Sequence, residues 1–324
     1  MQGRMGMALA ASLWLASTLA AGAEEVTLKG ITSFAEKTFY SRGFERFIDK
    51  VNADGKGLVQ ISYIGGPKAM PPFEVGNALK SGVVDLANVT GAFYTNVMPE
   101  ADAWKLTQKP MAELRKDGGY AYMANLYEQK MNAILLARHI DNNPFHLYLT
   151  KPISGPDLTG LKLRITPVYR DFFQALGATV VQTAPGEVYT ALERGVIDGT
   201  GFPNIGLTEQ GWEKLLKYRI YPTFWQGDIS LIVNADSWKR LDAKARDLLQ
   251  KSAIKAEKSA HEFFHNEVRK EDAKLKAAGM KDIRLPPEDA KKYEAAAHGA
   301  LWDQLGTRLS KQEVDTLRKT FYKE

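Results

Sequence analysis

Strand-like and helix-like stretches alternate along most of the chain, and this order limits the fold more than any other feature. The first set runs through a strand at 26–31, a helix at 41–52, a strand at 58–64, a helix starting at Pro72 and a strand at 84–89. The second set has strands at 145–149, 163–165 and 179–181 and helices at 167–176 and 185–194. A β-α-β-α-β order is typical of a parallel sheet with right-handed crossovers. Two such units predict an α/β fold of two lobes, with a ligand crevice at the carboxyl ends of the strands.

A long amphipathic helix is predicted between about residues 236 and 276. Charged side chains fill most of its surface, and its apolar stripe consists of Leu241, Ala245, Leu249, Ala253, Ala256, Ala260, Phe264 and Val268. A helix of this length can span two lobes and brace them. We expect Gly279 to end it in a left-handed conformation.

The first 23 residues have the pattern of an export signal. Arg4 supplies a positive charge, residues 5–20 are uncharged and largely apolar, and an Ala-Gly-Ala sequence ends at Ala23. The alternative is a transmembrane anchor, but the apolar run falls short of the roughly 20 residues that a bilayer requires. We therefore expect residues 1–23 to be a signal peptide that is cleaved after Ala23.

Composition excludes several classes of site. The chain has no cysteine, so it has no thiol nucleophile, thiolate zinc site or iron–sulfur cluster. Its net charge is +5, or +4 once the charge of Arg4 is removed, with Lys and Glu interspersed. Nucleic-acid-binding proteins usually carry a basic stripe, so no nucleic-acid partner is expected. A mild positive excess favours anionic small solutes.

One catalytic motif occurs literally, at residues 261–265. His261, Glu262 and His265 match H-E-x-x-H, in which two histidines one helical turn apart hold zinc and the glutamate acts as the base. The extended form with a third histidine is absent after His265, and Glu262 falls on the charged side of the predicted helix. A secreted zinc metalloprotease is the alternative hypothesis, and a charged helix with two half-exposed histidines is the simpler one.

Arg164 is unusual because it alternates with Leu163 and Ile165 in a short predicted strand. A buried charge is costly unless it is paired, and no acidic residue stands next to it in the sequence. One interpretation pairs it with an Asp or Glu that is distant in the chain. The other is a guanidinium that receives the carboxylate of a ligand, because its planar fork matches that anion with two hydrogen bonds.

The sequence around Arg164 resembles the substrate-binding proteins of TRAP transporters, the tripartite ATP-independent periplasmic systems (the DctP-like family). The similar blocks are a Gly-Leu-Lys-x-Arg strand at 160–164, a helix ending in Leu-Gly-Ala at 176–178, and Glu-Val-Tyr-Thr-Ala-Leu with a later Asp-Gly at 187–199. Further similarities occur at 65–66, 81–85, 98–100 and 151–153. The resemblance therefore covers essentially the whole chain after the signal peptide.

This resemblance implies a two-lobed periplasmic-binding-protein fold with a ligand cleft between the lobes and a long bracing helix. Lobe I would comprise residues 24–141 and 227–269, and lobe II residues 142–226 and 270–324. It also implies a periplasmic protein that is not an enzyme, needs no cofactor, and delivers a small organic acid to integral-membrane permease subunits. No metal-binding residue is assigned, and the sequence leaves open whether a metal ion assists ligand binding. A stand-alone sensory or chaperone-like binding module would share the fold and lack the transporter.

The resemblance also implies which residues contact the ligand. Arg164 matches the family's carboxylate-anchoring arginine, Phe202 replaces a commonly occurring Asn, and Phe145 occupies the place of a second arginine found in some members that bind acidic sugars. The other implied cleft residues are Thr32, Thr90, Phe93 and Trp225. Aromatic residues are more often plain core, but at these positions they indicate an apolar pocket with one anionic anchor. Such a pocket disfavours sialic acid and dicarboxylates and favours a monocarboxylate with an apolar or aromatic body.

Overall fold

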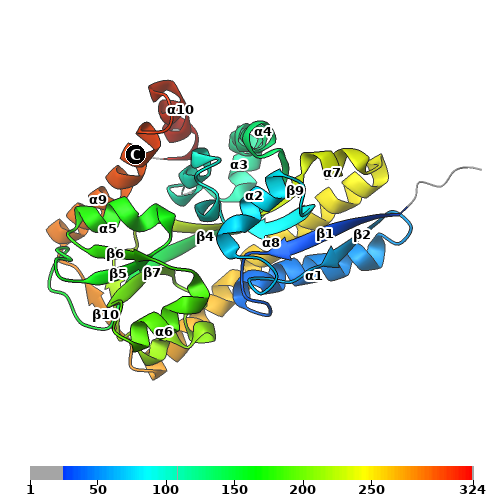
Figure 1. Ribbon diagram of the computed structural model, residues 1–324. Coiled ribbons are helices and arrows are strands. Elements are labelled where there is room, and N and C mark those ends of the chain that lie inside the picture. The colour runs from blue at the N-terminus through cyan, green and yellow to red at the C-terminus, as the bar shows by residue number, and fades with distance from the viewer. Residues whose placement is uncertain (1–24, 108, 323–324) are drawn as a thin grey trace, which may run out of the picture.

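Two α/β lobes make up the chain in the computed structural model (Figure 1). The structure describes residues 25–107 and 109–322, apart from the side chains of Asn142, His261 and Glu262. The predicted signal peptide therefore lies outside the described residues. Among the helices that the structure describes, none combines the length and the apolar character needed to cross a membrane.

The first lobe opens with a parallel arrangement, as the sequence predicts. Its strands are β1 (Val26–Thr32), β2 (Val59–Tyr63) and β3 (Leu86–Val89), and β1 lies between the other two and parallel to both. Its helices are α1 (Phe39–Asp54), α2 (Val75–Lys80), α3 (Met111–Asp117) and α4 (Gly119–Met131). The Ser41 hydroxyl accepts a hydrogen bond from the Thr38 N–H at 3.1 Å and so caps the start of α1. The apolar face of α1 packs against β1 and β2.

The second lobe repeats the arrangement with shorter elements. Its strands are β5 (Lys162–Ile165), β6 (Thr179–Gln182), β7 (Gly199–Pro203), β8 (Tyr218–Tyr221) and β10 (Lys281–Arg284). Its short helices are α5 (Arg170–Ala175) and α6 (Val188–Glu193). Because β5 runs parallel to both β6 and β7, the carboxyl ends of these three strands lie at one edge of the sheet.

Two long strands, β4 (Ala133–Leu149) and β9 (Gln226–Asn234), connect the lobes. β9 is antiparallel to β3 on one side and to the first part of β4 on the other, while the end of β4 pairs with β7. The strand order is β2-β1-β3-β9-β4-β7-β5-β6. The sequence predicts only the last five residues of β4, because Arg138, His139 and Asp141 interrupt an alternating pattern in its first part.

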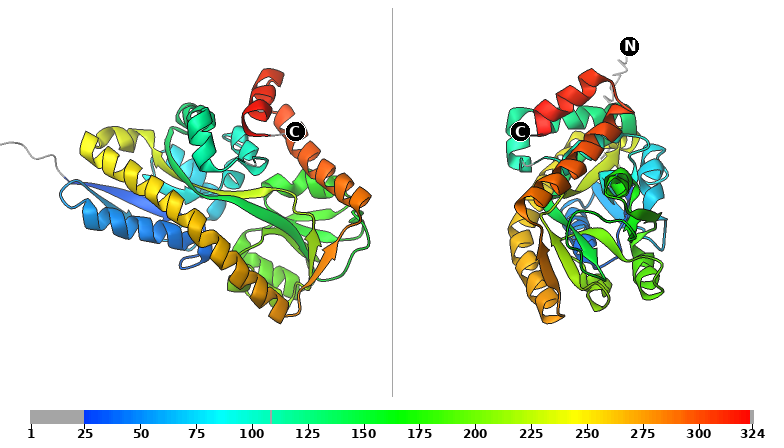
Figure 2. Two further views of the ribbon diagram at one scale, coloured as in Figure 1. Left: turned by 180° about the vertical axis from the view of Figure 1, so that it is seen from behind. Right: turned by 90° about the vertical axis from the view of Figure 1, so that its left-hand side faces the viewer.

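The segment predicted to be one long helix contains two, α7 (Ala235–Arg240) and α8 (Ala243–Ala277). The prediction of an unbroken helix is wrong because Leu241 is extended and the Asp242 side chain caps α8 by accepting a hydrogen bond from the Ala245 N–H. Gly279 has φ +83°, the left-handed conformation predicted after the helix. Figure 2 shows α8 running behind both lobes, where it braces them.

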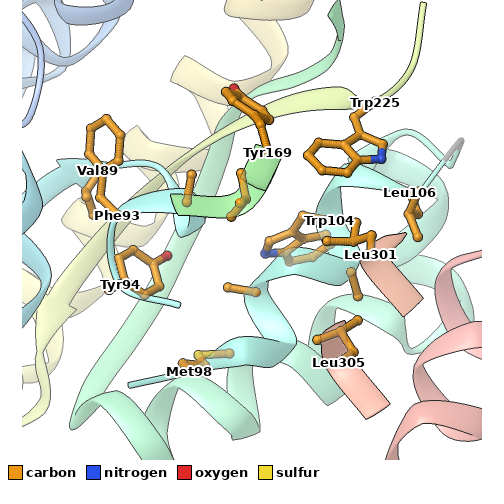
Figure 3. Close-up of a cluster of buried hydrophobic side chains, with 14 of the residues drawn as sticks. Val89, Phe93, Tyr94, Met98, Trp104, Leu106, Tyr169, Trp225, Leu301 and Leu305 are labelled. Carbon is orange, nitrogen blue, oxygen red and sulfur yellow. The ribbon is translucent and has the colours of Figure 1, made fainter. Parts of the chain in front are cut away.

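The C-terminal helices α9 (Pro287–Gly306) and α10 (Lys311–Phe321) pack on both lobes. Figure 3 shows Leu301 and Leu305 of α9 beside Trp104, which lies in a 3-10 segment of the first lobe. The Phe321 ring also contacts the Trp104 ring edge-on, with centroids 5.2 Å apart. α9 packs against α5 of the second lobe as well. The residue boundaries predicted for lobe I and lobe II stay predictions.

His139 of β4 is a buried histidine whose two ring nitrogens have no hydrogen-bond partner in the described part of the chain. Burial, reinforced by nearby Arg46, lowers its pKa from 6.5 to about 3. Between these two pH values the unfolded chain binds more protons than the folded one, so His139 lowers the free energy of unfolding as the pH falls. The loss should reach about 2–3 kcal/mol at pH 4.5.

Replacing His139 by Phe removes this group and keeps a ring of similar size. We expect urea unfolding to show that the decrease in stability from pH 7 to pH 4.5 is about 2–3 kcal/mol smaller in His139→Phe than in the unmodified protein. An equal decrease in both proteins would contradict a neutral, buried His139.

Candidate functional site

A cleft of about 690 Å³ lies between the lobes. The segments that follow β1, β2 and β3 form its wall in the first lobe. Arg164 of β5 and the segments that follow β5 and β6 form its wall in the second. β4, β7 and β9 contribute the remainder. Ligands of α/β proteins commonly bind at the carboxyl ends of strands, so this cleft is the candidate functional site.

Six of the seven residues predicted to contact a ligand line this cleft. They come from five different stretches of the chain and are Thr90, Phe93, Phe145, Arg164, Phe202 and Trp225. The seventh, Thr32, is fully buried and is not part of the lining. Its hydroxyl oxygen accepts a hydrogen bond from the Asn88 side chain at 2.8 Å, so it helps to hold the end of β1 against β3.

Arg164 is the only arginine among the described residues of the cleft lining, and its guanidinium is only partly hydrogen-bonded. Its side chain is 1% exposed, and its Nε donates to the Thr183 carbonyl at 2.9 Å. Its Nη2 is buried and has no hydrogen-bond partner. Burial lowers the pKa of Arg164 to about 10, opposed by Tyr169 and Glu187, so the group is charged at neutral pH.

The alternative interpretation of Arg164, an ion pair with a distant acid, is not favoured by this geometry. Glu187 is the carboxylate that acts on Arg164 most strongly, yet no salt bridge joins them, and Glu187 instead accepts a hydrogen bond from the Thr183 hydroxyl. A buried charge without a partner costs several kcal/mol. A carboxylate that enters the cleft would supply the missing partner with charge-assisted hydrogen bonds.

The aromatic residues of the cleft are held in fixed clusters. Tyr169 contacts Phe145 and Trp225, with ring centroids 5.6 and 5.5 Å away. The Trp225 indole N–H donates to the carbonyl of Ala297 in α9 at 3.1 Å. On the other side, Phe202 contacts Tyr40 edge-on at 6.1 Å. These contacts restrict the rings, so the apolar surfaces are formed before a ligand binds.

Sequence reasoning missed a group of polar atoms in the same cleft. Five lining residues have a buried side-chain atom without a hydrogen-bond partner, namely Ser33 Oγ, Asn143 Oδ1, Arg164 Nη2, Thr166 Oγ1 and Gln226 Oε1. Buried polar atoms are usually hydrogen-bonded, so their concentration here indicates a site for a polar ligand. Single Ser, Asn, Thr and Gln residues form no recognisable motif, and only the fold brings them together.

The zinc hypothesis receives no support from the structure. His265 is exposed on α8, and the side chains of His261 and Glu262 lie outside the description. Among the described residues, no three His, Asp or Glu side chains are arranged to hold a metal ion. A catalytic zinc site needs three protein ligands, and the described residues offer no such group.

Comparison with protein families decides the class. The model of the bacterial extracellular solute-binding proteins, family 7 (DctP), matches residues 31–306. The chain belongs to this family. Family 7 proteins include the periplasmic solute-binding proteins of TRAP transporters, which are transport components rather than enzymes. Family 7 membership implies a periplasmic location and a small organic acid as the ligand.

Proteins that are similar to this chain bind different acids, as their names state. A monocarboxylate 2-oxoacid-binding periplasmic protein of Nostoc sp. is 25% identical over 250 residues, covering 74% of this chain and 68% of the relative. A C4-dicarboxylate-binding periplasmic protein of Rhodobacter capsulatus is 25% identical over 317 residues, covering 95% of each chain. The crystal structure of a Bordetella pertussis extracytoplasmic solute receptor binding pyroglutamic acid is similar with a TM-score of 0.81 and 19% identity, covering 91% of this chain and 99% of that one. This last likeness shows the two-lobed fold.

Proposed function

We propose that this chain captures a small monocarboxylate with an apolar or aromatic body and delivers it to a TRAP permease. The observation that carries this proposal is the buried guanidinium of Arg164, which lines the cleft with Nη2 unpartnered. A guanidinium binds a carboxylate with two parallel hydrogen bonds. One such anchor corresponds to one carboxylate on the ligand.

The aromatic surfaces support an apolar face on the ligand. Phe93 projects from the first lobe, Phe202 from the second, and Phe145 and Trp225 from the connection between them. A ligand between the lobes would therefore meet an aromatic ring from each side. Burying apolar ligand surface contributes about 25 cal/mol per Å², and pre-formed walls keep the cost of ordering low.

The other cations of the cleft argue against a second carboxylate. Lys105 is 4% exposed, and its ammonium donates to Asp102 at 2.6 Å and lies 3.8 Å from Asp228. Lys68 is exposed to solvent. A dicarboxylate would need a second unpaired, buried cation, so we expect it to bind less tightly than a monocarboxylate.

Export and delivery complete the proposal. We propose that residues 1–23 are removed after Ala23, so that N-terminal sequencing of the exported protein should begin at Glu24. In the periplasm the loaded protein would bring its acid to the integral-membrane permease subunits of a TRAP transporter. No step of this role changes the ligand chemically.

Isothermal titration calorimetry with matched acids tests the proposed ligand class. We expect monocarboxylates of four to nine carbons to bind one per chain, and the dicarboxylates succinate and malate to bind at least about tenfold more weakly, because the cleft offers them no second free cation. Mass spectrometry of the recovered ligand should show no turnover. Tighter binding of a dicarboxylate than of every monocarboxylate would contradict the proposed class.

A further inference from the structure

A buried charge cluster forms part of the cleft wall apart from Arg164. Asp228 of β9 and Lys105 both line the cleft, and Asp102 lies behind them as a buried partner of Lys105. Asp228 Oδ2 accepts a hydrogen bond from the Gly91 N–H at 3.0 Å. Its Oδ1 has longer contacts, 3.4 Å from the Thr90 hydroxyl and 3.8 Å from the Lys105 ammonium. The partners of Asp228 Oδ1 are therefore more distant than the partner of Oδ2.

The wall of the cleft at Asp228 differs in its charged groups from the wall at Arg164. Asp228 and Asp102 both lie against the ammonium of Lys105, and the more distant Arg308 also acts on Asp102. Tyr169 lies close enough to both walls to feel their charges. Burial has the largest effect on its pKa, which it raises; Arg164 lowers the pKa, and Asp228 and Asp102 raise it further. The wall at Asp228 therefore presents a carboxylate to the cleft, and the wall at Arg164 presents a guanidinium.

Independent polar atoms mark the same wall as a ligand contact. Asn143 pairs with Gly227, the neighbour of Asp228, across β4 and β9. Asn143 is fully buried and lines the cleft with its Oδ1 unpartnered. Oδ1 of Asn143 and the carboxylate of Asp228 are hydrogen-bond acceptors. A ligand that meets this wall needs donors.

We propose that Asp228, held by the Gly91 N–H and by Lys105, selects a monocarboxylate that carries a hydroxyl or N–H donor on its body and rejects a second carboxylate. This inference rests on the proposed function and refines its ligand class. The carboxylate of the ligand occupies the Arg164 side, its apolar face lies on the aromatic rings, and its donor meets Asp228. An anionic group at the donor position would meet the carboxylate of Asp228, and like charges repel each other.

A four-carbon series isolates the contribution of the donor. The probes are butanoate, its 2-, 3- and 4-hydroxy derivatives, and succinate, with gluconate and hexanoate as a longer hydroxylated and unsubstituted pair. We expect at least one hydroxylated acid to bind about tenfold or more tightly than the unsubstituted acid of the same length, because a hydrogen bond to a charged acceptor gains that much. Calorimetry in a buffer free of divalent cations measures each affinity.

Asp228→Asn tests whether Asp228 is the residue that accepts a hydrogen bond from the donor of the ligand. The amide keeps the shape and can still accept from Gly91, but it removes the negative charge. We expect the preference for the hydroxylated acid to fall about tenfold or more, and the affinity for succinate to rise relative to butanoate. Asp85→Asn is the matched control, because Asp85 is a buried, hydrogen-bonded carboxylate outside the cleft lining. It should leave the whole series in its original order.

The outcomes separate this inference from the proposed function. If no monocarboxylate binds, the proposed function fails and the inference with it. If monocarboxylates bind but hydroxylated and unsubstituted acids bind equally, or Asp228→Asn leaves their ratio unchanged, the inference alone is wrong. Binding that requires added Na⁺ or Ca²⁺ and disappears in Asp228→Asn would assign Asp228 to a metal ion and also overturn the inference.

Discussion

Arg164→Ala should weaken binding of the preferred carboxylate at least about a hundredfold, because removing one partner of a buried, hydrogen-bonded charge pair costs about 2–5 kcal/mol. The free protein should stay folded. In the protein without ligand, Arg164 is buried and its Nη2 has no partner. Removing the side chain therefore also removes the unfavourable free energy of an uncompensated buried charge. Calorimetry measures the affinity, and urea unfolding measures the stability.

Two further variants serve as controls for the Arg164→Ala measurement. Arg170→Ala removes a nearby positive charge that is exposed and outside the cleft lining, so it should leave the affinity almost unchanged. Arg164→Lys keeps the positive charge but loses the planar guanidinium. Its affinity for the ligand should therefore lie between those of Arg164→Ala and Arg170→Ala. Affinity close to that of the unmodified protein in Arg164→Ala would remove Arg164 from the site.

Ligand binding should also stabilise the protein and close the lobes. A ligand that binds only the folded state adds about 2.7 kcal/mol to the free energy of unfolding at a concentration one hundred times its Kd, which raises the Tm by on the order of 5 °C. Because the cleft takes residues from both lobes, only a closed arrangement makes both sets of contacts. Small-angle X-ray scattering should therefore give a smaller radius of gyration with ligand.

The same measurements on Arg164→Ala provide the control for closure. At equal ligand concentration this variant should show almost no rise in Tm and no change in radius, since its affinity is too low for the site to fill. If the Tm and the radius of the unmodified protein respond to none of a broad panel of carboxylates, the binding function is contradicted.

The elements with regular patterns could be predicted from the sequence. The strands and helices of each βαβ unit have local signals, such as the apolar face of α1 and the left-handed Gly279. The break between α7 and α8 was missed because Leu241 continues the apolar stripe although its backbone is extended. The first part of β4 was missed because it contains polar residues, among them Arg138, which is fully buried against Trp104.

The candidate site divides in the same way. Arg164 could be identified because a charge in an apolar strand is costly and the surrounding blocks resemble a family. Asp228 and Asn143 could not, because each is an ordinary polar residue until β4 and β9 bring them to one wall. Thr32 was placed at the cleft by alignment, but its hydroxyl is engaged with Asn88. The sequence predicted an apolar pocket with a single anchor for an anion. Asp228 and Asn143 add a polar wall, so the pocket is aromatic on some surfaces and polar on others.

The most direct test of the account is native mass spectrometry of the protein purified gently from the periplasm, followed by identification of the released ligand. We expect one small monocarboxylate per chain in the unmodified protein and an empty Arg164→Ala variant. A ligand without an acidic group, or the same acid retained equally by Arg164→Ala, would contradict it.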